Sequence, residues 1–230
     1  MNEQTLSRRL ERVAAQVPQG ARLADIGSDH GYLPIALKLR GVIDSAVAGE
    51  VALTPYLSAQ RKVRKNALQA VIDVRHGSGL TVLQASDRIS VVTMCGMGGE
   101  TIRDILIEGQ QHLRGNELLV LQPNVREWVA RGWLAEHGYQ IIHEEMLEEN
   151  AFTYEVIVAR RAQGPRYTPE QCYFGPLLMA ERSALFLAKW RLNLQRKQRV
   201  MAHWPKAKDV PSSKREEIGQ QVRWITEMLG

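Results

Sequence analysis

The alternation of strand-like and helical segments over the first 160 residues is the feature that most limits the fold. Five short apolar runs are predicted as strands: residues 22–26, 45–48, 71–75, 89–94 and 117–121. Strands that alternate with helices are typical of a parallel α/β sheet. Two further runs, 140–143 and 153–159, are expected to close this sheet as an antiparallel pair.

Helical periodicity fills the stretches around these strands. The spacing of Leu6, Leu10, Val13, Ala14 and Val17 predicts a first helix. A second helix is expected after Gly27, with a buried face that extends to Leu39. Thr54 is expected to cap a third helix with Pro55 in its first turn, and residues 99–111 and 124–137 are predicted as two more.

The pattern changes after Arg161, where no strand-like run follows. One heptad stripe contains Leu187, Trp190, Leu194, Met201 and Trp204, with Lys197 interrupting it, and a second contains Ile218, Val222, Ile225 and Leu229. This spacing predicts two helices in an antiparallel, coiled-coil-like hairpin. We therefore expect two domains, 1–161 and 162–230.

Charge divides along the chain in the same way. Residues 1–160 hold 17 lysines and arginines against 19 aspartates and glutamates, whereas residues 161–230 hold 13 against 6. A basic appendage on a neutral-to-acidic domain can bind nucleic acid, although a solvated helical face has the same composition. On charge alone the solvated face is favoured.

Composition excludes several classes of protein. A chain of 230 residues with 44% hydrophobic and 24% charged side chains is not disordered. It has no run of about 20 apolar residues that could span a bilayer and no apolar signal-peptide core, so we expect a cytoplasmic protein without membrane attachment. Its two cysteines cannot form a disulfide framework, and no metal-ligand spacing is present, so no metal is expected.

The loop after the first strand, Asp25-Ile-Gly-Ser-Asp-His-Gly-Tyr-Leu-Pro34, predicts a ligand site. Gly27 lets a ligand approach the backbone where a strand gives way to a helix. The spacing Gly27-x-x-x-Gly31 differs from the dinucleotide fingerprint, and Asp29 would repel a pyrophosphate. The loop therefore favours a cationic or neutral ligand that carries a nucleoside, unless it is a structural turn with Asp29 capping the helix.

Loops after the other strands should lie at the same sheet edge. Glu50 ends the second strand, 23 residues after Gly27, where an acid can accept hydrogen bonds from ribose hydroxyls. The loops 76–80, 95–99 and 121–124 follow the third, fourth and fifth strands, and the first of these could contact an adenine ring. Together the loops make a binding site far more specific than any one of them.

The segments Ala-Asp-Ile-Gly-Ser-Asp-His-Gly-Tyr-Leu-Pro, Ala-Gly-Glu, Gly-Met-Gly-Gly and Leu-Gln-Pro-Asn resemble the bacterial tRNA (adenine-N1)-methyltransferases that act on tRNA position 22. The resemblance spans essentially the whole chain. It implies a Rossmann-like class I methyltransferase sheet, S-adenosyl-L-methionine as cofactor, tRNA as substrate, and a C-terminal coiled-coil domain that binds tRNA.

The resemblance also implies roles for individual residues. The cofactor-binding residues would be Asp25, Gly27, Asp29, His30, Glu50, Gly77, Ser78, Gly79, Gly96 and Met97. Ser78 stands where the family usually has Asp, which reduces a carboxylate contact with the adenine amino group to a hydroxyl contact.

Methyl transfer to adenine N1 needs no base, because N1 has an in-plane lone pair. The catalytic candidates are therefore Asp29, which could accept from the exocyclic amine, and Asn124, which could orient the base or cap the following helix. His30 is expected to contribute a supporting hydrogen bond, and Cys95 is expected to be a packed thiol.

The RNA contacts are expected from the first helix and from the basic hairpin. The candidates are Arg8, Arg9, Arg12, Arg191, Arg196, Lys197, Arg199, Lys206 and Lys208. Three alternatives stay open: a class I methyltransferase of small molecules, a non-catalytic RNA-binding protein with a cofactor fold and, more distantly, an NAD-dependent oxidoreductase. The sequence does not give the oligomeric state.

Overall fold

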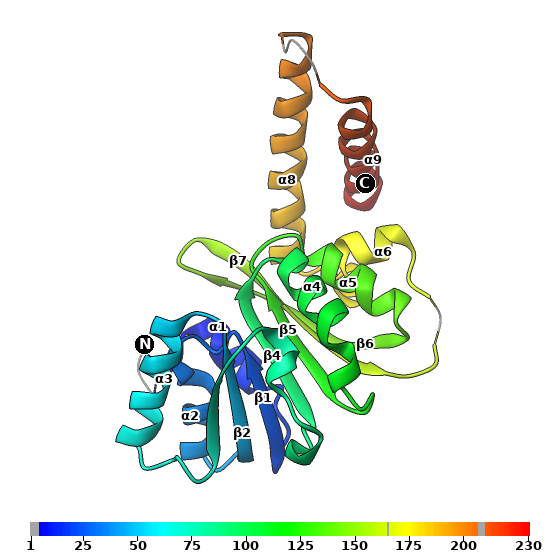
Figure 1. The fold of residues 1–230 in the computed structure, drawn as a ribbon. Coiled ribbons are helices and arrows are strands. Elements are labelled where there is room, and N and C mark those ends of the chain that lie inside the picture. The colour runs from blue at the N-terminus through cyan, green and yellow to red at the C-terminus, as the bar shows by residue number, and fades with distance from the viewer. Residues whose placement is uncertain (1–4, 165, 207–209) are drawn as a thin grey trace. The chain divides into compact units, whose positions relative to one another are not determined.

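The computed structural model describes residues 5–164, 166–206 and 210–230. The chain divides into two compact units, Met1–Leu177 and Leu178–Gly230, of which the first contains the sheet and the second is helical (Figure 1). The division falls later than the boundary expected after residue 161. Residues just beyond that point belong to the first unit because α6 (Pro169–Phe174) packs against α5 (Glu127–Glu136), with the rings of Trp128 and Tyr173 5.5 Å apart.

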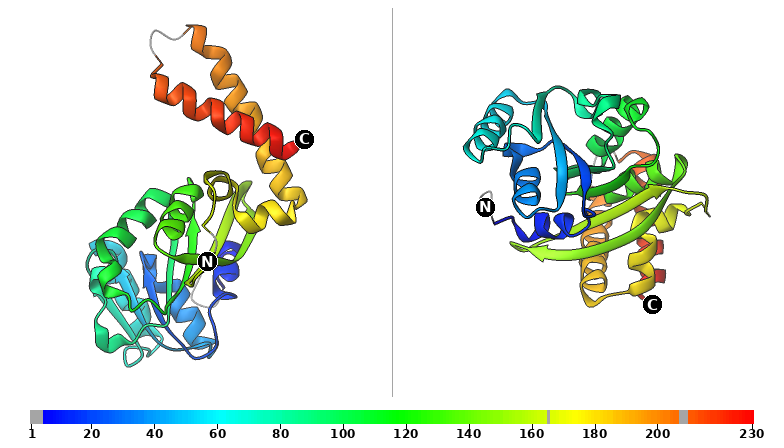
Figure 2. Two further views of the ribbon diagram at one scale, coloured as in Figure 1. Left: turned by 90° about the vertical axis from the view of Figure 1, so that its right-hand side faces the viewer. Right: turned by 90° about the horizontal axis from the view of Figure 1, so that it is seen from below.

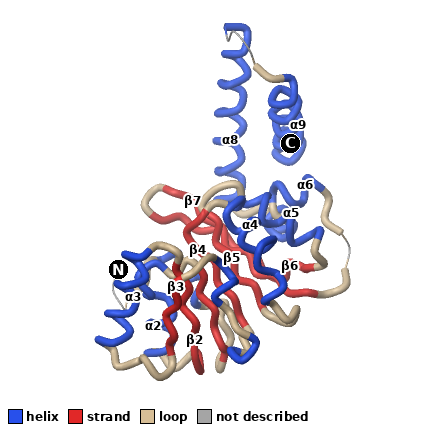
Figure 3. The backbone as a smooth tube through the Cα atoms, in the orientation of Figure 1, coloured by secondary structure: helices blue, strands red, loops and turns tan. Residues whose placement is uncertain are grey.

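The first unit is built on a mixed seven-stranded sheet in the order β3-β2-β1-β4-β5-β7-β6 (Figure 3). The strands are β1 Ala21–Ile26, β2 Ile43–Glu50, β3 Ile72–His76, β4 Val91–Met97, β5 Leu118–Pro123, β6 Tyr139–Glu149 and β7 Phe152–Arg161. Strands β1 to β5 are parallel, and β7 is antiparallel to both β5 and β6. The predicted parallel sheet with its closing antiparallel pair is confirmed.

Helices cover both faces of this sheet. They are α1 Arg8–Ala14, α2 Tyr32–Leu39, α3 Leu53–Lys65, α4 Gly99–Gly109 and α5, with short 3-10 turns at Asp29–Gly31, Gly79–Val82, Ala85–Asp87 and Gln110–His112. No helix in the described part of the chain combines the length and the apolarity that crossing a bilayer needs.

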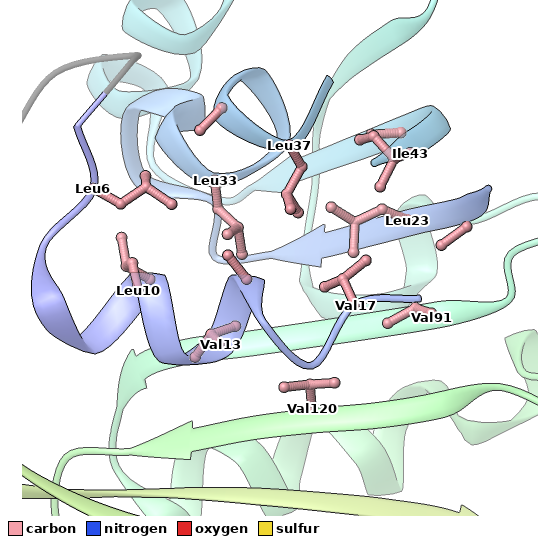
Figure 4. Close-up of a cluster of buried hydrophobic side chains, with 14 of the residues drawn as sticks. Leu6, Leu10, Val13, Val17, Leu23, Leu33, Leu37, Ile43, Val91 and Val120 are labelled. Atoms are coloured by element: carbon pink, nitrogen blue, oxygen red, sulfur yellow. The ribbon is translucent and has the colours of Figure 1, made fainter. Parts of the chain in front are cut away.

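The buried side chains form one hydrophobic cluster on each face. Leu10 and Val13 of α1 pack against Leu23, Val91 and Val120 of the sheet (Figure 4). The neighbouring residues Ala24, Val92 and Leu121 belong to the cluster under α4 and α5. Since side chains alternate along a strand, Asp25, Thr93 and Gln122 lie on the α1 face. This alternation places three polar residues beside α1, and Asp25 and Gln122 lie at the carboxyl ends of their strands.

Two local expectations are wrong. Helix α3 begins at Leu53 after Ala52, which has no capping side chain, so Thr54 lies inside the first turn rather than at the cap. Pro55 is tolerated there because first-turn N–H groups have no helical acceptor. Leu39 ends α2 with 47% of its surface exposed, whereas Leu33, Ile35 and Leu37 are buried.

The second unit contains α8 (Ala184–His203), a 3-10 turn (Trp204–Lys206) and α9 (Ser212–Leu229), while α7 (Pro176–Glu181) crosses the boundary between the units. Helices α8 and α9 lie side by side and run in opposite directions (Figure 2). Trp190 of α8 and Ile225 of α9 are buried. Lys197 Nζ donates a 2.5 Å hydrogen bond to Gln221 Oε1, which places a polar pair within this helix pair.

Candidate active site

A cavity of about 340 Å³ opens at the carboxyl ends of β1, β4 and β5. Its volume is in the range of small-molecule sites. Its lining includes the predicted site residues Asp25, Gly27, Asp29, Gly96, Met97 and Asn124, together with Arg9, Leu10, Ser28, Tyr32, Leu33 and Cys95. Four segments that are far apart in the sequence thus meet in one place, as the strand order predicts.

Asp25 is a buried carboxyl group in the wall of this cavity. It is 3% exposed, and it accepts hydrogen bonds from Ser28 Oγ at 2.6 Å and Thr93 Oγ1 at 2.7 Å. Burial raises the pKa of Asp25, and the two hydroxyl donors offset only part of that effect. A cation bound next to it would favour its ionised form, so a cationic ligand and the charge of Asp25 stabilise each other.

The turn after β1 has backbone torsions that favour glycine. Gly27 has φ +71°, and a Cβ there would lie 2.7 Å from Met97 Cε. Asp29 and His30 also have positive φ, 37° and 58°, which is uncommon for residues with a side chain. Such strain persists only where the surroundings hold it in place, and it is concentrated at functional sites.

Glu50 holds this strained turn in place. Its Oε2 accepts the N–H of Asp29 at 3.2 Å, and its Oε1 accepts the N–H of Ala52 at 3.0 Å. Each carboxylate oxygen keeps a lone pair for another donor. The proposed ribose contact of Glu50 therefore stays a prediction that is compatible with its structural role.

Asp29 and His30 belong to the 3-10 turn that follows β1. The Asp29 side chain is 69% exposed, and the 3-10 turn that begins there has no side-chain cap, so Asp29 does not act as a helix cap. His30 Nε2 lies 3.4 Å from Asp29 Oδ1. Its Nδ1 is buried without a hydrogen-bond partner in the described part of the chain, and His30 is not among the residues that line the cavity, so its predicted supporting hydrogen bond stays a prediction.

The segment 77–79 lies beside Glu50 but does not line the cavity. The N–H of Gly77 donates to the Glu50 carbonyl at 3.0 Å. A Cβ at Gly77 would lie 2.8 Å from Val82, and Gly79 has φ +52°. Local packing at Gly77 and the backbone torsion at Gly79 therefore each favour glycine without a bound ligand. Ser78 is exposed, and its predicted cofactor contact stays a prediction.

Gln122 is a site residue that the sequence argument missed. It is fully buried, and its Oε1 accepts the N–H of Gly96 at 3.0 Å and also a hydrogen bond from Arg9. Its Nε2 donates to Asn124 Oδ1 at 3.2 Å. The available signal was an amide side chain that directly follows the apolar run 118–121.

Asn124 does not cap a helix, because α5 begins at Glu127 after Arg126. Its Nδ2 donates to the Gly96 carbonyl at 2.8 Å, and its own N–H donates to the Met97 carbonyl at 2.8 Å. The predicted capping role of Asn124 is therefore wrong, and its role in orienting the acceptor base stays a prediction.

Cys95 shows no sign of activation. Burial and the nearby Asp25 raise the pKa of its thiol, so it stays protonated at neutral pH. The described residues also contain no cluster of three or more His, Cys, Asp or Glu side chains placed to hold a metal ion.

The arginines of α1 interact within the first unit. Arg12 Nε donates to Glu145 Oε2 at 2.7 Å, and Arg8 Nη1 donates to the Glu148 carbonyl at 3.1 Å. Arg9 contacts Gln122 and lies over the Tyr154 ring, 5.5 Å from its centroid. RNA contacts from these arginines would have to compete with these partners.

On α8 the basic candidates differ from one another. Arg191, Arg196 and Arg199 are exposed, whereas Lys197 is half-buried against Gln221, and burial lowers its pKa. Lys197 is therefore a weaker phosphate-binding candidate than the three arginines. Lys208 and the side chain of Lys206 lie outside the described residues.

Comparison with known proteins gives matches that extend over most of the chain. The model of the family described as TrmK, tRNA (adenine(22)-N(1))-methyltransferase, matches residues 23–227. The curated tRNA (adenine(22)-N(1))-methyltransferase of Bacillus subtilis strain 168 is 39% identical over 236 residues, which cover 100% of this chain and 99% of the relative.

Solved structures agree with these matches. The crystal structure of the Bacillus subtilis m1A22 tRNA methyltransferase TrmK superposes with a TM-score of 0.92 at 38% identity and covers 99% of this chain and 100% of that one. A Streptococcus pneumoniae protein in complex with S-adenosyl-L-methionine superposes with a TM-score of 0.88 at 40% identity and covers 98% of this chain and 100% of that one.

Proposed function

The chain belongs to the tRNA (adenine(22)-N(1))-methyltransferase family, and we propose that it transfers a methyl group from S-adenosyl-L-methionine to N1 of adenine 22 in tRNA. The observation that carries this proposal is that the buried carboxyl group of Asp25 and the side-chain amide of Asn124 line the same cavity. This arrangement suits a cationic nucleoside cofactor on one side and a planar base on the other.

The residues present fit this cofactor. Bound S-adenosyl-L-methionine supplies an electrophilic methyl group on a positively charged sulfur. The buried Asp25 favours a cation in the cavity, and Gly27 contributes backbone without a side chain to the cavity wall, where a Cβ would clash with Met97. Glu50 would accept from the ribose hydroxyls, and His30 Nδ1 would find the partner that it lacks among the described residues.

The remaining predicted cofactor-binding residues lie in the loops after β4 and β3. Gly96 and Met97 line the cavity beside Gly27. Gly77, Ser78 and Gly79 lie next to Glu50, on the side where the nucleoside base would extend beyond the ribose. The Ser78 hydroxyl would there replace the usual carboxylate contact with the adenine amino group.

The protein's main contribution to catalysis is to position the acceptor base. N1 lies on the Watson–Crick edge, so the adenine must be unpaired or splayed out of its stack before transfer. Asp29 would accept from the exocyclic amine and stabilise the positive charge that develops on the ring, while Asn124 fixes the base. The protonated thiol of Cys95 takes no part in a covalent step.

Residues 1–161 would carry the chemistry and residues 162–230 would hold the tRNA, except that α6 (Pro169–Phe174), which packs against α5, would belong to the catalytic part. The exposed Arg191, Arg196 and Arg199 of α8 would contact phosphates, which gives salt-dependent affinity without sequence readout. A tRNA-modifying enzyme of this kind would act in the cytoplasm.

Labelled methyl transfer tests the proposal. The purified protein is incubated with methyl-labelled S-adenosyl-L-methionine and either unmodified tRNA or free adenine nucleosides, and the digested products are identified by mass spectrometry. We expect N1-methyladenosine from tRNA only. Transfer only to small molecules would contradict the proposal, and so would the absence of any transfer.

A further inference from the structure

The hydrogen bonds of Gln122 fix the orientation of its side-chain amide. Its Oε1 faces two obligatory donors, the N–H of Gly96 and the guanidinium of Arg9. Its Nε2 donates to the Pro123 carbonyl at 3.0 Å and to Asn124 Oδ1 at 3.2 Å. A flipped amide would set N–H groups against these donors, so only one orientation satisfies the buried network.

This fixed amide in turn orients Asn124. Its Oδ1 must face the Gln122 donor, and its Nδ2 donates to the Gly96 carbonyl at 2.8 Å. These bonds use one lone pair of Oδ1 and one N–H of Nδ2. Within the described residues, the second lone pair and the second N–H have no hydrogen-bond partner, on an exposed side chain that lines the cavity. Asn124 therefore offers one acceptor and one donor to a ligand.

The proposed reaction restricts which edge of adenine can use this pair. N1 must face the methyl group, so a hydrogen bond to N1 would block the transfer. The exocyclic amine and N7 form the other edge, which presents one donor and one acceptor, and an Asn amide matches that edge with two hydrogen bonds. Guanine has acceptors at both O6 and N7, so it does not match.

We propose that Asn124 holds the acceptor adenine by its N6 and N7 atoms, and that Gln122 is the positioning residue that orients Asn124. This inference rests on the proposed function and deepens it. Asp29 then accepts the other hydrogen of the same amine, on the Watson–Crick side. The two residues together hold the amine while N1 stays free.

An atom exchange in the substrate tests this assignment. A tRNA with 7-deazaadenosine at position 22, assembled by ligation of synthetic halves, keeps N1 and the amine but replaces N7 by C–H. For each enzyme, kcat/KM for the adenosine tRNA is divided by kcat/KM for the 7-deazaadenosine tRNA. We expect this ratio to be about tenfold larger for the wild type than for Asn124→Ala. The ratio in the variant corrects for the different intrinsic reactivity of the two bases.

Two further variants separate positioning from folding. Gln122→Glu removes the donor that fixes Asn124, so we expect it to lose the discrimination between the two tRNAs while it still methylates the adenosine tRNA. A general loss of structure would lower both rates together and leave their ratio unchanged. Asn116→Ala is the matched control because Asn116 is exposed and precedes the amino end of β5, away from the site, and it should discriminate as the wild type does.

Equal ratios for the wild type and Asn124→Ala would overturn the assignment of N7 to Asn124, while methylation of the adenosine tRNA would leave the proposed function intact. Unchanged discrimination in Gln122→Glu would overturn the positioning role. A wild-type enzyme that does not methylate the adenosine tRNA would instead remove the proposed function, and this inference with it.

Discussion

At the scale of single residues, two acids of the same loop are expected to do different work. Asp25 is buried with its carboxylate held by two hydroxyls, whereas the Asp29 side chain is exposed at the opening of the cavity. The sequence places both in the loop but does not show which one is buried. Strand alternation decides this, because Asp25 still belongs to β1 and Asp29 follows the turn.

Asp25→Asn is expected to weaken cofactor binding by about tenfold or more, because the cation loses its buried counter-charge. Isothermal titration with S-adenosyl-L-methionine measures this affinity. Asp44→Asn, an exposed exchange in β2, is the control and should bind as the wild type does. Unchanged affinity in Asp25→Asn would contradict the assignment.

The same variant makes a prediction about pH. Burial raises the pKa of Asp25, so the folded state holds this proton more tightly than the unfolded state, and stability is lost as pH rises through the folded-state pKa. Asn at this position does not ionise. Without ligand, Asp25→Asn should therefore have a higher Tm than the wild type at pH 7, by roughly 2–4 °C per kcal/mol of removed penalty, and the gap should shrink towards pH 4. A gap that widens on acidification would contradict the sign.

Asp29→Asn should act on the chemical step instead. Asn tolerates the positive φ of this position and can still accept a hydrogen bond, but it lacks the charge that stabilises a cationic adenine product. We expect kcat at saturating cofactor and tRNA to fall about tenfold. Near-normal turnover would exclude Asp29 from contact with the acceptor base.

At the scale of secondary structure elements, the sequence predicted most of the fold. The five parallel strands and the closing pair follow from apolar runs and turn residues, since both report local backbone preferences. The true end of β6 lies well beyond the predicted run 140–143, because the polar residues Glu144 and Glu145 are also in this strand. Strand β7 extends the predicted run 153–159 by only one residue at its start and two at its end. The hydrophobic periodicity of a sequence does not reveal charged side chains that are buried because they form ion pairs with another helix or strand.

Arg131 of α5 shows such pairing. Its Nε donates to Glu144 Oε1 at 2.6 Å, it also bonds Glu155, and all three side chains are almost fully buried. Arg131→Met should lower the free energy of unfolding by about 3–5 kcal/mol, because two buried carboxylates lose their partner. Urea denaturation measures this value, and a further exchange of both acids to Gln should recover part of it. A loss below about 1 kcal/mol would show that the network is not needed.

On α8, the exposed arginines are expected to act as phosphate ligands. Arg196→Ala with Arg199→Ala should weaken tRNA binding and make the dependence of log affinity on log salt shallower by roughly 1–2. Arg88→Ala with Arg114→Ala removes the same charge from exposed positions at the amino ends of β4 and β5 and serves as the control. Equal effects of the two pairs on binding would mean that only net charge matters.

At the scale of the whole molecule, we propose that catalysis and tRNA binding belong to different parts of the chain. The charge asymmetry suggested this division but did not establish it, because a solvated helix can have the same composition. The sequence also could not assign the basic residues individually. Arg12 contacts Glu145 and Lys197 contacts Gln221, and these contacts depend on pairings between distant segments.

Truncation after Leu177 tests the division. We expect the shortened protein to bind S-adenosyl-L-methionine with an affinity within about threefold of the full chain, and to lose most of its tRNA affinity. Circular dichroism establishes that the truncated chain is folded. Retention of full tRNA affinity would assign tRNA binding to the sheet-containing unit.

The central claim is that N1 of adenine 22 receives the methyl group. Reverse transcription of treated tRNA tests it most directly, because a methyl group on the Watson–Crick edge stops the polymerase at the modified base. We expect a stop one nucleotide before position 22 that requires both enzyme and S-adenosyl-L-methionine and disappears when guanine replaces adenine 22. A stop at another adenine, or methyl incorporation without a stop at this position, would contradict it.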